Sequence, residues 1–184
     1  IRGQRRTVEL MKKSTNSGSP YFTKRSKVVE KTVPCRLNFN SESLSVTQSL
    51  PNSLWDACAV LGWRGQEGGP SKEDVKQRVV WMFPFAVNVA ELQLYQPLIE
   101  AMQHSRIPKV PAWVSMESVD RAITRMFDTK AAKDLVICTD FSKFDQHFNK
   151  DLQDCAAKCI SYLFKGDSGL TNWINDVFPI KYAI

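Results

Sequence analysis

The feature that most constrains this chain is an unbroken run of strand-forming residues leading directly to a carboxylate, Leu135-Val136-Ile137-Cys138-Thr139-Asp140. Aliphatic and β-branched residues in such a run predict a buried strand over 135–139. A carboxylate ending an apolar strand is expensive to desolvate unless it binds a cation or reaches a cleft, so Asp140 is a candidate metal ligand. A second carboxylate, Asp145, follows five residues later. Spacing alone favours a plainer account, in which Asp140 caps a turn and Asp145 is simply exposed.

Positive charge is concentrated at the N-terminus of the chain. Residues 1–36 contain ten Lys or Arg and two Glu, whereas all 184 residues together carry a net charge of +6. A basic segment ahead of a near-neutral body suits a phosphate backbone, whose neutralisation releases counterions. A solvated basic tail explains the same pattern equally well.

A polar stretch within this basic segment has no apolar periodicity and consists of turn-forming residue types, Thr15-Asn16-Ser17-Gly18-Ser19-Pro20. It predicts a loop in which small hydroxyl side chains and a glycine let the backbone approach a phosphate closely. By composition alone this is weak evidence, because most such loops are only loops.

Two bases precede an apolar run further along the chain. Lys76 and Arg78 lead into Val79-Val80-Trp81-Met82-Phe83, which predicts a buried strand, and residues 64–70 before them predict a glycine-rich loop. Two positions apart on an extended chain, the two bases point to the same side and can hold one polyphosphate. Spacing alone favours two solvated bases at a strand end.

Apolar periodicity predicts the remaining elements. A short helix is expected near 5–13, and further helices at 53–62, 88–102 with Asn88 and Glu91 as its capping pair, 115–128, 149–163 and 171–178, with another strand from 180. A composition of 43% hydrophobic and 24% charged residues is typical of a globular protein. Five cysteines without regular spacing give no reason to expect disulfides, and no apolar run is long enough to span a bilayer.

Three stretches together resemble the motifs of viral RNA-dependent RNA polymerases, most closely those of picobirnaviruses. The run Asp140-Phe141-Ser142-Lys143-Phe144-Asp145 resembles motif A of this family, residues 76–84 resemble motif F, and residues 15–20 resemble motif G. They occur in the family's order, G, F, A, and span most of the chain.

The resemblance implies an α+β fold that is a fragment of a right-hand polymerase with fingers, palm and thumb. Residues 1–130 are expected to form helix-rich fingers with a basic template-contacting segment, and residues 131–184 the start of the palm. Neither motif B nor motif C is present, because Gly166–Asn172 contains parts of both but lies too close to motif A. That stretch is expected to be a helix-ending turn, and the chain, which lacks an initiator Met, a piece of a longer protein.

The resemblance also implies roles for single residues. Asp140, helped by the Phe141 carbonyl, binds the catalytic Mg²⁺ or Mn²⁺, and Asp145 favours ribonucleotides over deoxyribonucleotides. Arg78 and Lys76 contact the incoming triphosphate. The loop at 15–20 guides the template strand, with Lys24 and Arg25 of the basic segment as further RNA contacts.

The implied function is RNA-directed RNA polymerisation that replicates and transcribes a viral genome by two-metal phosphoryl transfer, with these 184 residues inactive by themselves. The implied partners are RNA template and product and ribonucleoside triphosphates, with a viral capsid as a further candidate and no membrane; the implied location is the virion or the host-cell cytoplasm. Two alternatives stay open: a reverse-transcriptase-like palm enzyme, and a non-catalytic RNA-binding module whose whole function is the basic N-terminus.

Overall fold

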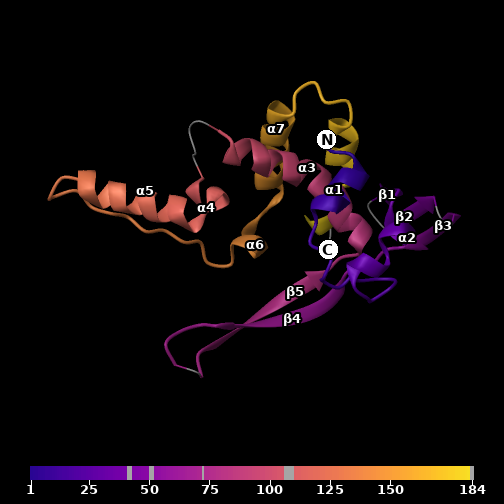
Figure 1. Ribbon diagram of the computed structural model, residues 1–184, viewed down its shortest axis with the longest axis horizontal. Helices are drawn as coiled ribbons and strands as arrows, with labels where there is room; N and C mark the ends of the chain where they lie inside the picture. Colours follow the sequence, from indigo (N-terminus) through magenta and orange to yellow (C-terminus); the bar gives the residue numbers. More distant parts are fainter. Residues whose placement is uncertain (41–42, 50–51, 72, 106–109, 183–184) are drawn as a thin grey trace. The chain divides into compact units, whose positions relative to one another are not determined.

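The computed structural model describes residues 1–40, 43–49, 52–71, 73–105 and 110–182 (Figure 1). Helices and strands both contribute, which confirms the predicted α+β class. The chain divides into two compact units, one formed by Ile1–Leu94 with Ser168–Ile184 and the other by Tyr95–Asp167. The predicted boundary at residue 130 falls inside the second unit, and the division into fingers and palm stays a prediction.

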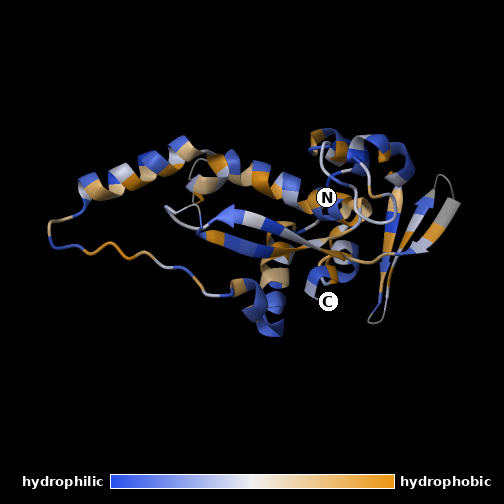
Figure 2. Ribbon diagram, turned by 90° about the horizontal axis from the view of Figure 1, so that it is seen from below, coloured by the Kyte–Doolittle hydropathy of each residue, from blue (hydrophilic) through white to orange (hydrophobic). Residues whose placement is uncertain are grey.

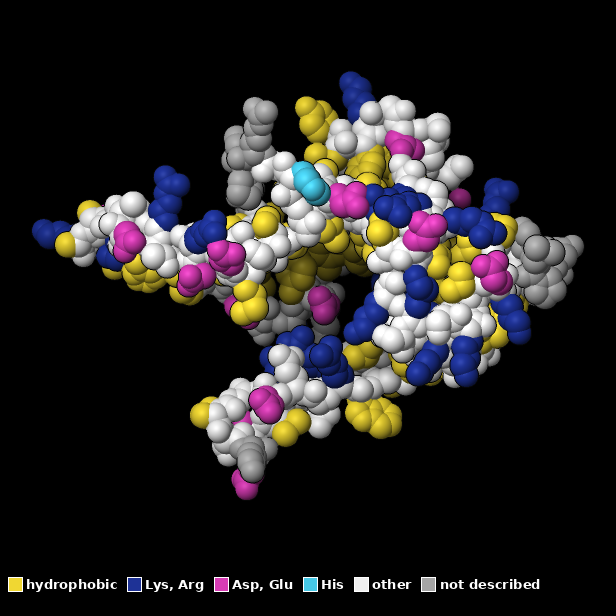
Figure 3. Space-filling model, in the orientation of Figure 1, with side chains coloured by type: hydrophobic (Ala, Val, Ile, Leu, Met, Phe, Trp, Pro, Cys, Tyr) yellow, Lys and Arg dark blue, Asp and Glu magenta, His cyan; other side chains and the backbone are white. Residues whose placement is uncertain are grey.

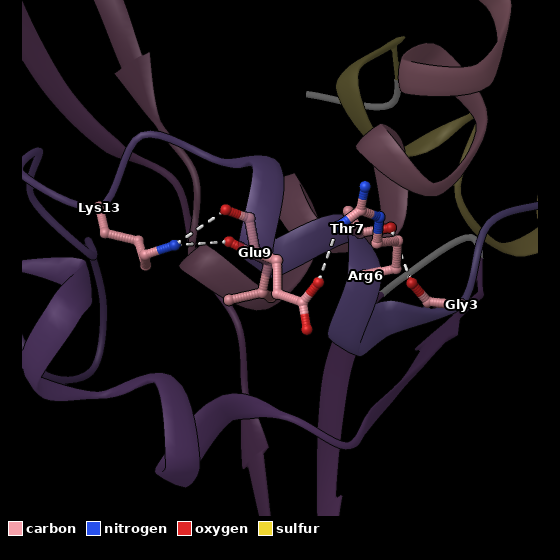
Figure 4. A network of polar contacts seen from close by, with 6 residues as sticks. Gly3, Arg6, Thr7, Glu9 and Lys13 are labelled. Atoms are coloured by element: carbon pink, nitrogen blue, oxygen red, sulfur yellow. Dashed lines mark hydrogen bonds and ion pairs between the residues drawn. The ribbon is translucent and has the colours of Figure 1, made fainter.

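The first unit opens with helix α1 (Gln4–Leu10), which confirms the short helix expected near the N-terminus. Its carbonyl end is closed by Lys13, whose ammonium group donates to the carbonyl oxygens of Val8 at 3.0 Å and Glu9 at 3.1 Å (Figure 4). A cation at this end also interacts favourably with the helix dipole. Within the helix the Thr7 hydroxyl donates to the Gly3 carbonyl at 3.0 Å. The Lys13 side chain thus satisfies two carbonyl groups at the C-terminal end of a helix too short to be stable by itself.

The core of the first unit is built around the start of helix α3 (Phe85–Gln103). Two short elements follow the loop, η1 (Arg25–Lys27) and α2 (Val29–Thr32), and the residues on either side of α2, Val28 and Val33, supply further apolar side chains. The buried cluster is Val8, Met11, Val28, Val33, Phe85 and Val89. The predicted helix is confirmed, with Pro97 inside it, but it begins one turn earlier. Asn88 and Glu91 are therefore not caps, because their side chains make contacts from inside the helix.

The end of the chain returns to α3. Helix α8 (Leu170–Asp176) confirms the predicted last helix, and its Trp173 indole nitrogen donates to the Ala90 carbonyl at 2.7 Å. The expected strand from residue 180 is wrong, since Ile180–Tyr182 forms the 3₁₀ turn η2; residues 183–184 lie outside the described residues. No strand pairs with the described part of this segment, and Ile180 is buried as part of the turn.

A three-stranded antiparallel sheet follows α2, formed by β1 (Cys35–Phe39), β2 (Leu44–Ser49) and β3 (Asn52–Asp56). Leu37, Val46 and Trp55 lie side by side on its inner face. The helix predicted over 53–62 is wrong, because these residues form β3 and begin the next strand. Residues 52–56 form a strand because they pair with β2. A short helical pattern of apolar residues does not reveal that such a partner strand exists.

The next two strands, β4 (Val60–Glu67) and β5 (Val75–Met82), form a separate antiparallel hairpin. The predicted strand at β5 is confirmed, but its predicted burial is wrong, since Val79 and Trp81 are 66% and 52% exposed. Among the described residues no third strand pairs with this two-stranded ribbon. The loop predicted over 64–70 is wrong in its first half, because β4 continues to Glu67 and the turn begins at Gly68.

The second unit contains the end of α3 followed by four helices, α4 (Pro111–Val114), α5 (Met116–Thr129), α6 (Phe144–His147) and α7 (Lys150–Leu163). The helices predicted at 115–128 and 149–163 are confirmed, and a side chain caps the start of each. Ser115 accepts from the Ser118 amide at 3.0 Å, and Asn149 accepts from the Leu152 amide at 3.1 Å. The expected turn after α7 is also confirmed, with Gly166 at φ 92°.

The strand predicted over 135–139 is not formed. Residues 135–141 have no regular secondary structure, although the segment is largely hydrophobic (orange in Figure 2). Leu135 and Ile137 are 88% and 80% exposed. A strand needs a neighbour for its backbone groups, and no described residue pairs with this segment. In the part of the chain that the structure describes, no helix combines the length and apolar character needed to cross a membrane.

Candidate functional site

The loop at residues 14–25 folds back on itself through backbone hydrogen bonds. The Ser17 amide donates to the Thr23 carbonyl at 2.7 Å, and the Gly18 amide donates to the Asn16 side chain at 2.7 Å. Ser17 and Gly18 are buried, whereas Thr15, Asn16 and Pro20 are exposed and Ser19 is intermediate. The loop predicted to guide a template therefore has an inner part that holds it in place and an outer part that faces solvent.

Gly18 meets a requirement that only glycine satisfies without strain. Its φ is +64°, and a Cβ atom at this position would lie 2.8 Å from the Phe83 carbonyl oxygen. The Phe85 amide donates to the Ser17 carbonyl at 2.8 Å. The loop is thus fastened to the point where β5 ends and α3 begins.

The two bases predicted to bind RNA in this region have different surroundings. Lys24 is exposed. Arg25 is half-buried, donates from Nε to the Asn16 carbonyl at 3.3 Å and from Nη2 to Asn88 Oδ1 at 2.7 Å, and lies over the Phe85 ring. Its burial lowers the pKa of the guanidinium from the ordinary value. Two of the five N–H donors of Arg25 therefore bind groups of the protein itself.

Three cations share one face of the hairpin. Lys76 and Arg78 are two positions apart on β5, as predicted, and Arg64 on β4 stands directly opposite Arg78. Directly paired residues of an antiparallel ladder point to the same side, so all three side chains lie on one face. Figure 3 shows Lys and Arg side chains gathered over the hairpin and the N-terminal loops.

The pairing of Arg64 with Arg78 is unfavourable unless an anion compensates it. Like charges directly opposite on neighbouring strands destabilise a sheet. All three cations are exposed, and none forms an ion pair with a described acidic residue. Sequence reasoning missed Arg64 because it assigned residues 64–70 to a loop. A hairpin signal was present in the Gly68-Gly69 turn between two runs of strand residues.

The two predicted catalytic carboxylates lie in the second unit. Asp140 is exposed, and its Oδ1 accepts from the Phe141 amide at 2.8 Å. Asp145 is exposed in the first turn of α6, which begins after Lys143 in the left-handed conformation at φ 51°. The Phe144 ring lies 6.0 Å from that of Phe141 and 5.7 Å from that of Phe148, so packed aromatic rings join the two ends of this stretch.

A divalent cation fits Asp140 as one ligand of several. Among the described residues no three His, Cys, Asp or Glu side chains gather into a group that can hold a metal. Mg²⁺ is commonly held by one or two carboxylates, with water and substrate phosphates completing its coordination. An exposed carboxylate followed by a backbone carbonyl at Phe141 suits such a partial site. Lys76, Arg78 and the loop at 15–20 lie in the first unit and Asp140 and Asp145 in the second.

Comparisons with known proteins cover nearly the whole chain. The sequence profile of the family described as viral RNA-dependent RNA polymerase matches residues 5–178. A relative from human picobirnavirus (strain Human/Thailand/Hy005102/-), described as a potential RNA-dependent RNA polymerase, is 58% identical over 184 residues, covering 100% of this chain and 34% of the relative.

Solved structures agree with this match. The crystal structure of the RNA-dependent RNA polymerase of a human picobirnavirus has a TM-score of 0.86 and 58% identity, covering 99% of this chain and 35% of that one. An insertion loop deletion mutant of such a polymerase has a TM-score of 0.88 over the same shares. The chain spans about a third of the length of these relatives. On this evidence, the chain belongs to the family of viral RNA-dependent RNA polymerases.

Proposed function

We propose that the protein containing this chain is an RNA-directed RNA polymerase that copies a viral RNA genome. The observation that carries the proposal is the cationic face of the hairpin, where Arg64, Lys76 and Arg78 lie together without an acidic partner among the described residues. A nucleoside triphosphate supplies the concentrated negative charge that this face lacks. Family membership supports the same conclusion.

In this proposal Arg78 and Lys76 hold the triphosphate, and Arg64 adds a third cation to the same group. Phosphoryl transfer requires little covalent chemistry from the protein, so rate depends on positioning and on stabilising charge. The backbone of a paired strand is held more rigidly than that of a loop. The hairpin thus fixes the backbone positions from which the three cationic side chains extend.

Asp140 and the Phe141 carbonyl would hold a divalent cation, Mg²⁺ or Mn²⁺, which would supply Lewis acidity and charge stabilisation for two-metal phosphoryl transfer. The role of Asp140 is to hold the positive charge of that cation next to residues 140–145. Asp145, one turn further, accepts a hydrogen bond from a ribose hydroxyl. A deoxyribonucleotide lacks this group, so Asp145 separates RNA synthesis from the reverse-transcriptase-like alternative.

The exposed side of the loop at 15–20, with Lys24, would contact the template strand. Thr15, Asn16 and Lys24 offer a hydroxyl, an amide and a charge to phosphates. Ser17 and Gly18 act by holding the loop. We assign residues 1–130 to the fingers and 131–184 to the palm. We place the protein in the virion or the host-cell cytoplasm, with RNA, ribonucleotides and a viral capsid as partners.

Replacement of single hairpin cations in the full-length protein tests the proposal. Arg78→Gln and Arg64→Gln should each raise the KM for a ribonucleotide about 10- to 100-fold, as expected for a lost charge-assisted hydrogen bond of about 1.5–3 kcal/mol. Arg125→Gln, which removes an exposed arginine from α5, is the matched control and should leave KM unchanged. An unaltered KM in both hairpin variants would remove the cationic face from the nucleotide site.

A further inference from the structure

The junction between β5 and α3 is enclosed by two cations from distant parts of the chain. Its residues Phe83, Pro84 and Phe85 are buried. The Arg25 guanidinium lies 5.2 Å from the centre of the Phe85 ring, and the Lys181 ammonium lies 5.2 Å from the centre of the Phe83 ring. Each contact is within the range of an attractive cation–π interaction. One aromatic ring on either side of Pro84 is therefore covered by a cation.

Two side chains of α3 join these cations into one network. Arg25 Nη2 donates to Asn88 Oδ1 at 2.7 Å, and Asn88 Nδ2 donates to Glu91 Oε2 at 3.4 Å. Glu91 then forms an ion pair with Lys181 at 2.8 Å, although its own side chain is only 9% exposed. A carboxylate buried to this extent needs a counter-charge. The four residues Arg25, Asn88, Glu91 and Lys181 are called the Arg25–Lys181 network below.

The loop at 15–20, called the template loop below, is attached to the same junction. The Ser17 carbonyl accepts from the Phe85 amide, Gly18 lies against the Phe83 carbonyl, and Arg25 Nε donates to the Asn16 carbonyl. The loop, the end of β5 and the C-terminal turn η2 therefore meet at three consecutive residues.

The hairpin depends on this junction for its direction. Both strands are largely exposed, and burial along β5 begins only where the strand ends, at Phe83. Lys76 and Arg78 stand on the exposed part of that strand. Whatever fixes Phe83 and Phe85 therefore also fixes the direction in which the two cations are presented.

We propose that the Arg25–Lys181 network is a positioning device that couples the template loop to the strand holding the nucleotide. The proposal rests on the proposed function. Asn88, Glu91 and Lys181 touch neither RNA nor nucleotide in it; they act through Phe83 and Phe85. In this proposal Arg25 holds the loop in position through its bond to the Asn16 carbonyl. This role replaces the direct RNA contact that the sequence predicts for Arg25.

A phosphate contact and a positioning contact give different results on substitution. Loss of a phosphate contact lowers the salt dependence of RNA binding by about one charge. Loss of a positioning contact leaves that slope unchanged but weakens nucleotide binding, since the coupling between two sites is typically worth 5- to 150-fold. Lys181 provides the clearest variant, because its side chain is partly exposed and its loss leaves the core apolar residues intact.

The test uses the full-length protein with Lys181→Met, its conservative variant Lys181→Arg, and Lys158→Met, which removes an exposed lysine from α7. Lys181→Met should raise the KM for a ribonucleotide on the order of tenfold with a smaller change in kcat, and should leave the salt slope of RNA binding unchanged. Amide hydrogen exchange at Ser17 and Phe85 should become about tenfold faster. Lys181→Arg should restore both values, and Lys158→Met should match the wild type.

Three results would overturn the positioning role. The first is wild-type KM and exchange rates in Lys181→Met, the second is a lowered melting temperature with unchanged KM, and the third is a reduced salt slope. If the wild-type protein itself synthesises no RNA, the proposed function fails. Exchange at Ser17 and Phe85 in the Lys181 variants then decides the network separately, with faster exchange supporting it and unchanged exchange overturning it.

Discussion

Single residues at the junction of the template loop and β5 leave little freedom for substitution. Gly18 combines a left-handed backbone with a neighbouring carbonyl that belongs to another segment. The neighbour is backbone, which cannot swing away as a flexible side chain can. Both the conformation and the space therefore require glycine at this position.

We expect Gly18→Ala to destabilise the protein by about 1–3 kcal/mol, because the new side chain strains the backbone and meets the Phe83 carbonyl. Thermal or urea unfolding measures this change. Gly3→Ala is the matched control, since nothing lies within 4 Å of a Cβ at Gly3. Equal effects of the two substitutions would contradict the account of Gly18.

The role of Asp140 is tested by a change that keeps the size of the side chain and removes its charge. Asp140→Asn in the full-length protein should lower the rate of RNA synthesis more than about 100-fold, because metal-assisted charge stabilisation is worth several kcal/mol. The measurement is template-dependent incorporation of labelled ribonucleotide. Asp154→Asn, which breaks an exposed ion pair with Lys150, should retain activity. An active Asp140→Asn variant would exclude this carboxylate from the metal site.

At the scale of whole elements, the sequence predicts best where the signal is local. Ser115 and Asn149 precede apolar helical patterns and each accepts a capping hydrogen bond, because a cap and its helix lie within four residues of each other. Pro84 comes two residues after the end of β5 and likewise marks the end of the apolar run. For such elements the sequence contains the whole explanation.

Elements that depend on a distant partner are where prediction fails. Leu54 and Leu61 suggested a helical face, but Trp55 pairs with Val46 and the segment is a strand. Arg64 was assigned to a loop because its partner, Arg78, lies fourteen residues away. The aliphatic run at 135–139 has strand propensity without a described neighbour to pair with, so it stays extended without forming a sheet.

The same contrast holds for the candidate site. The motif strings locate Lys76, Arg78, Asp140 and Asp145, because each lies within a short recognisable run. They cannot identify Asn88 and Lys181, since only the folded chain brings these residues to the junction. Candidate binding residues are thus easier to find in a sequence than residues that a distant contact brings to the site.

The local cap at α7 provides a test of an element's stability. Asn149→Ala should lower the free energy of unfolding by about 0.5–2 kcal/mol, because the Leu152 amide loses its acceptor. Asn149→Asp should cost little, since it keeps an acceptor and places a negative charge at the positive end of the helix dipole. Chemical denaturation compares the two variants. An unchanged free energy of unfolding in Asn149→Ala, or a loss of the same size in both variants, would contradict a stabilising role of this acceptor.

At the scale of the whole molecule, charge and catalytic groups are unevenly distributed. The basic N-terminal segment and the cationic hairpin belong to the first unit, and both candidate catalytic carboxylates to the second. Nucleic-acid affinity of this type arises mainly from counterion release and falls with added salt. One candidate metal carboxylate does not complete a two-metal site.

The 184-residue chain is therefore expected to bind single-stranded RNA weakly and to incorporate no nucleotide. Between 50 mM and 200 mM salt its affinity should fall by at least about tenfold, as expected when several phosphates are neutralised. Filter binding across this range measures the slope, and a primed template with labelled ribonucleotide tests for synthesis. Template-dependent incorporation by the isolated chain would contradict the expectation, as would RNA binding that is indifferent to salt.

The return of residues 168–182 to α3 has a consequence for protein engineering. The chain leaves its first unit after Leu94 and re-enters it at Ser168, and the Trp173 indole bound to the Ala90 carbonyl fixes the re-entry next to α3. The second unit is in this sense an insertion into the first. Residues 1–94 and 168–184 joined by a short Gly-Ser linker would retain the buried cluster, the Arg25–Lys181 network and the cationic hairpin. Such a miniature would separate the cationic hairpin from the two candidate catalytic carboxylates.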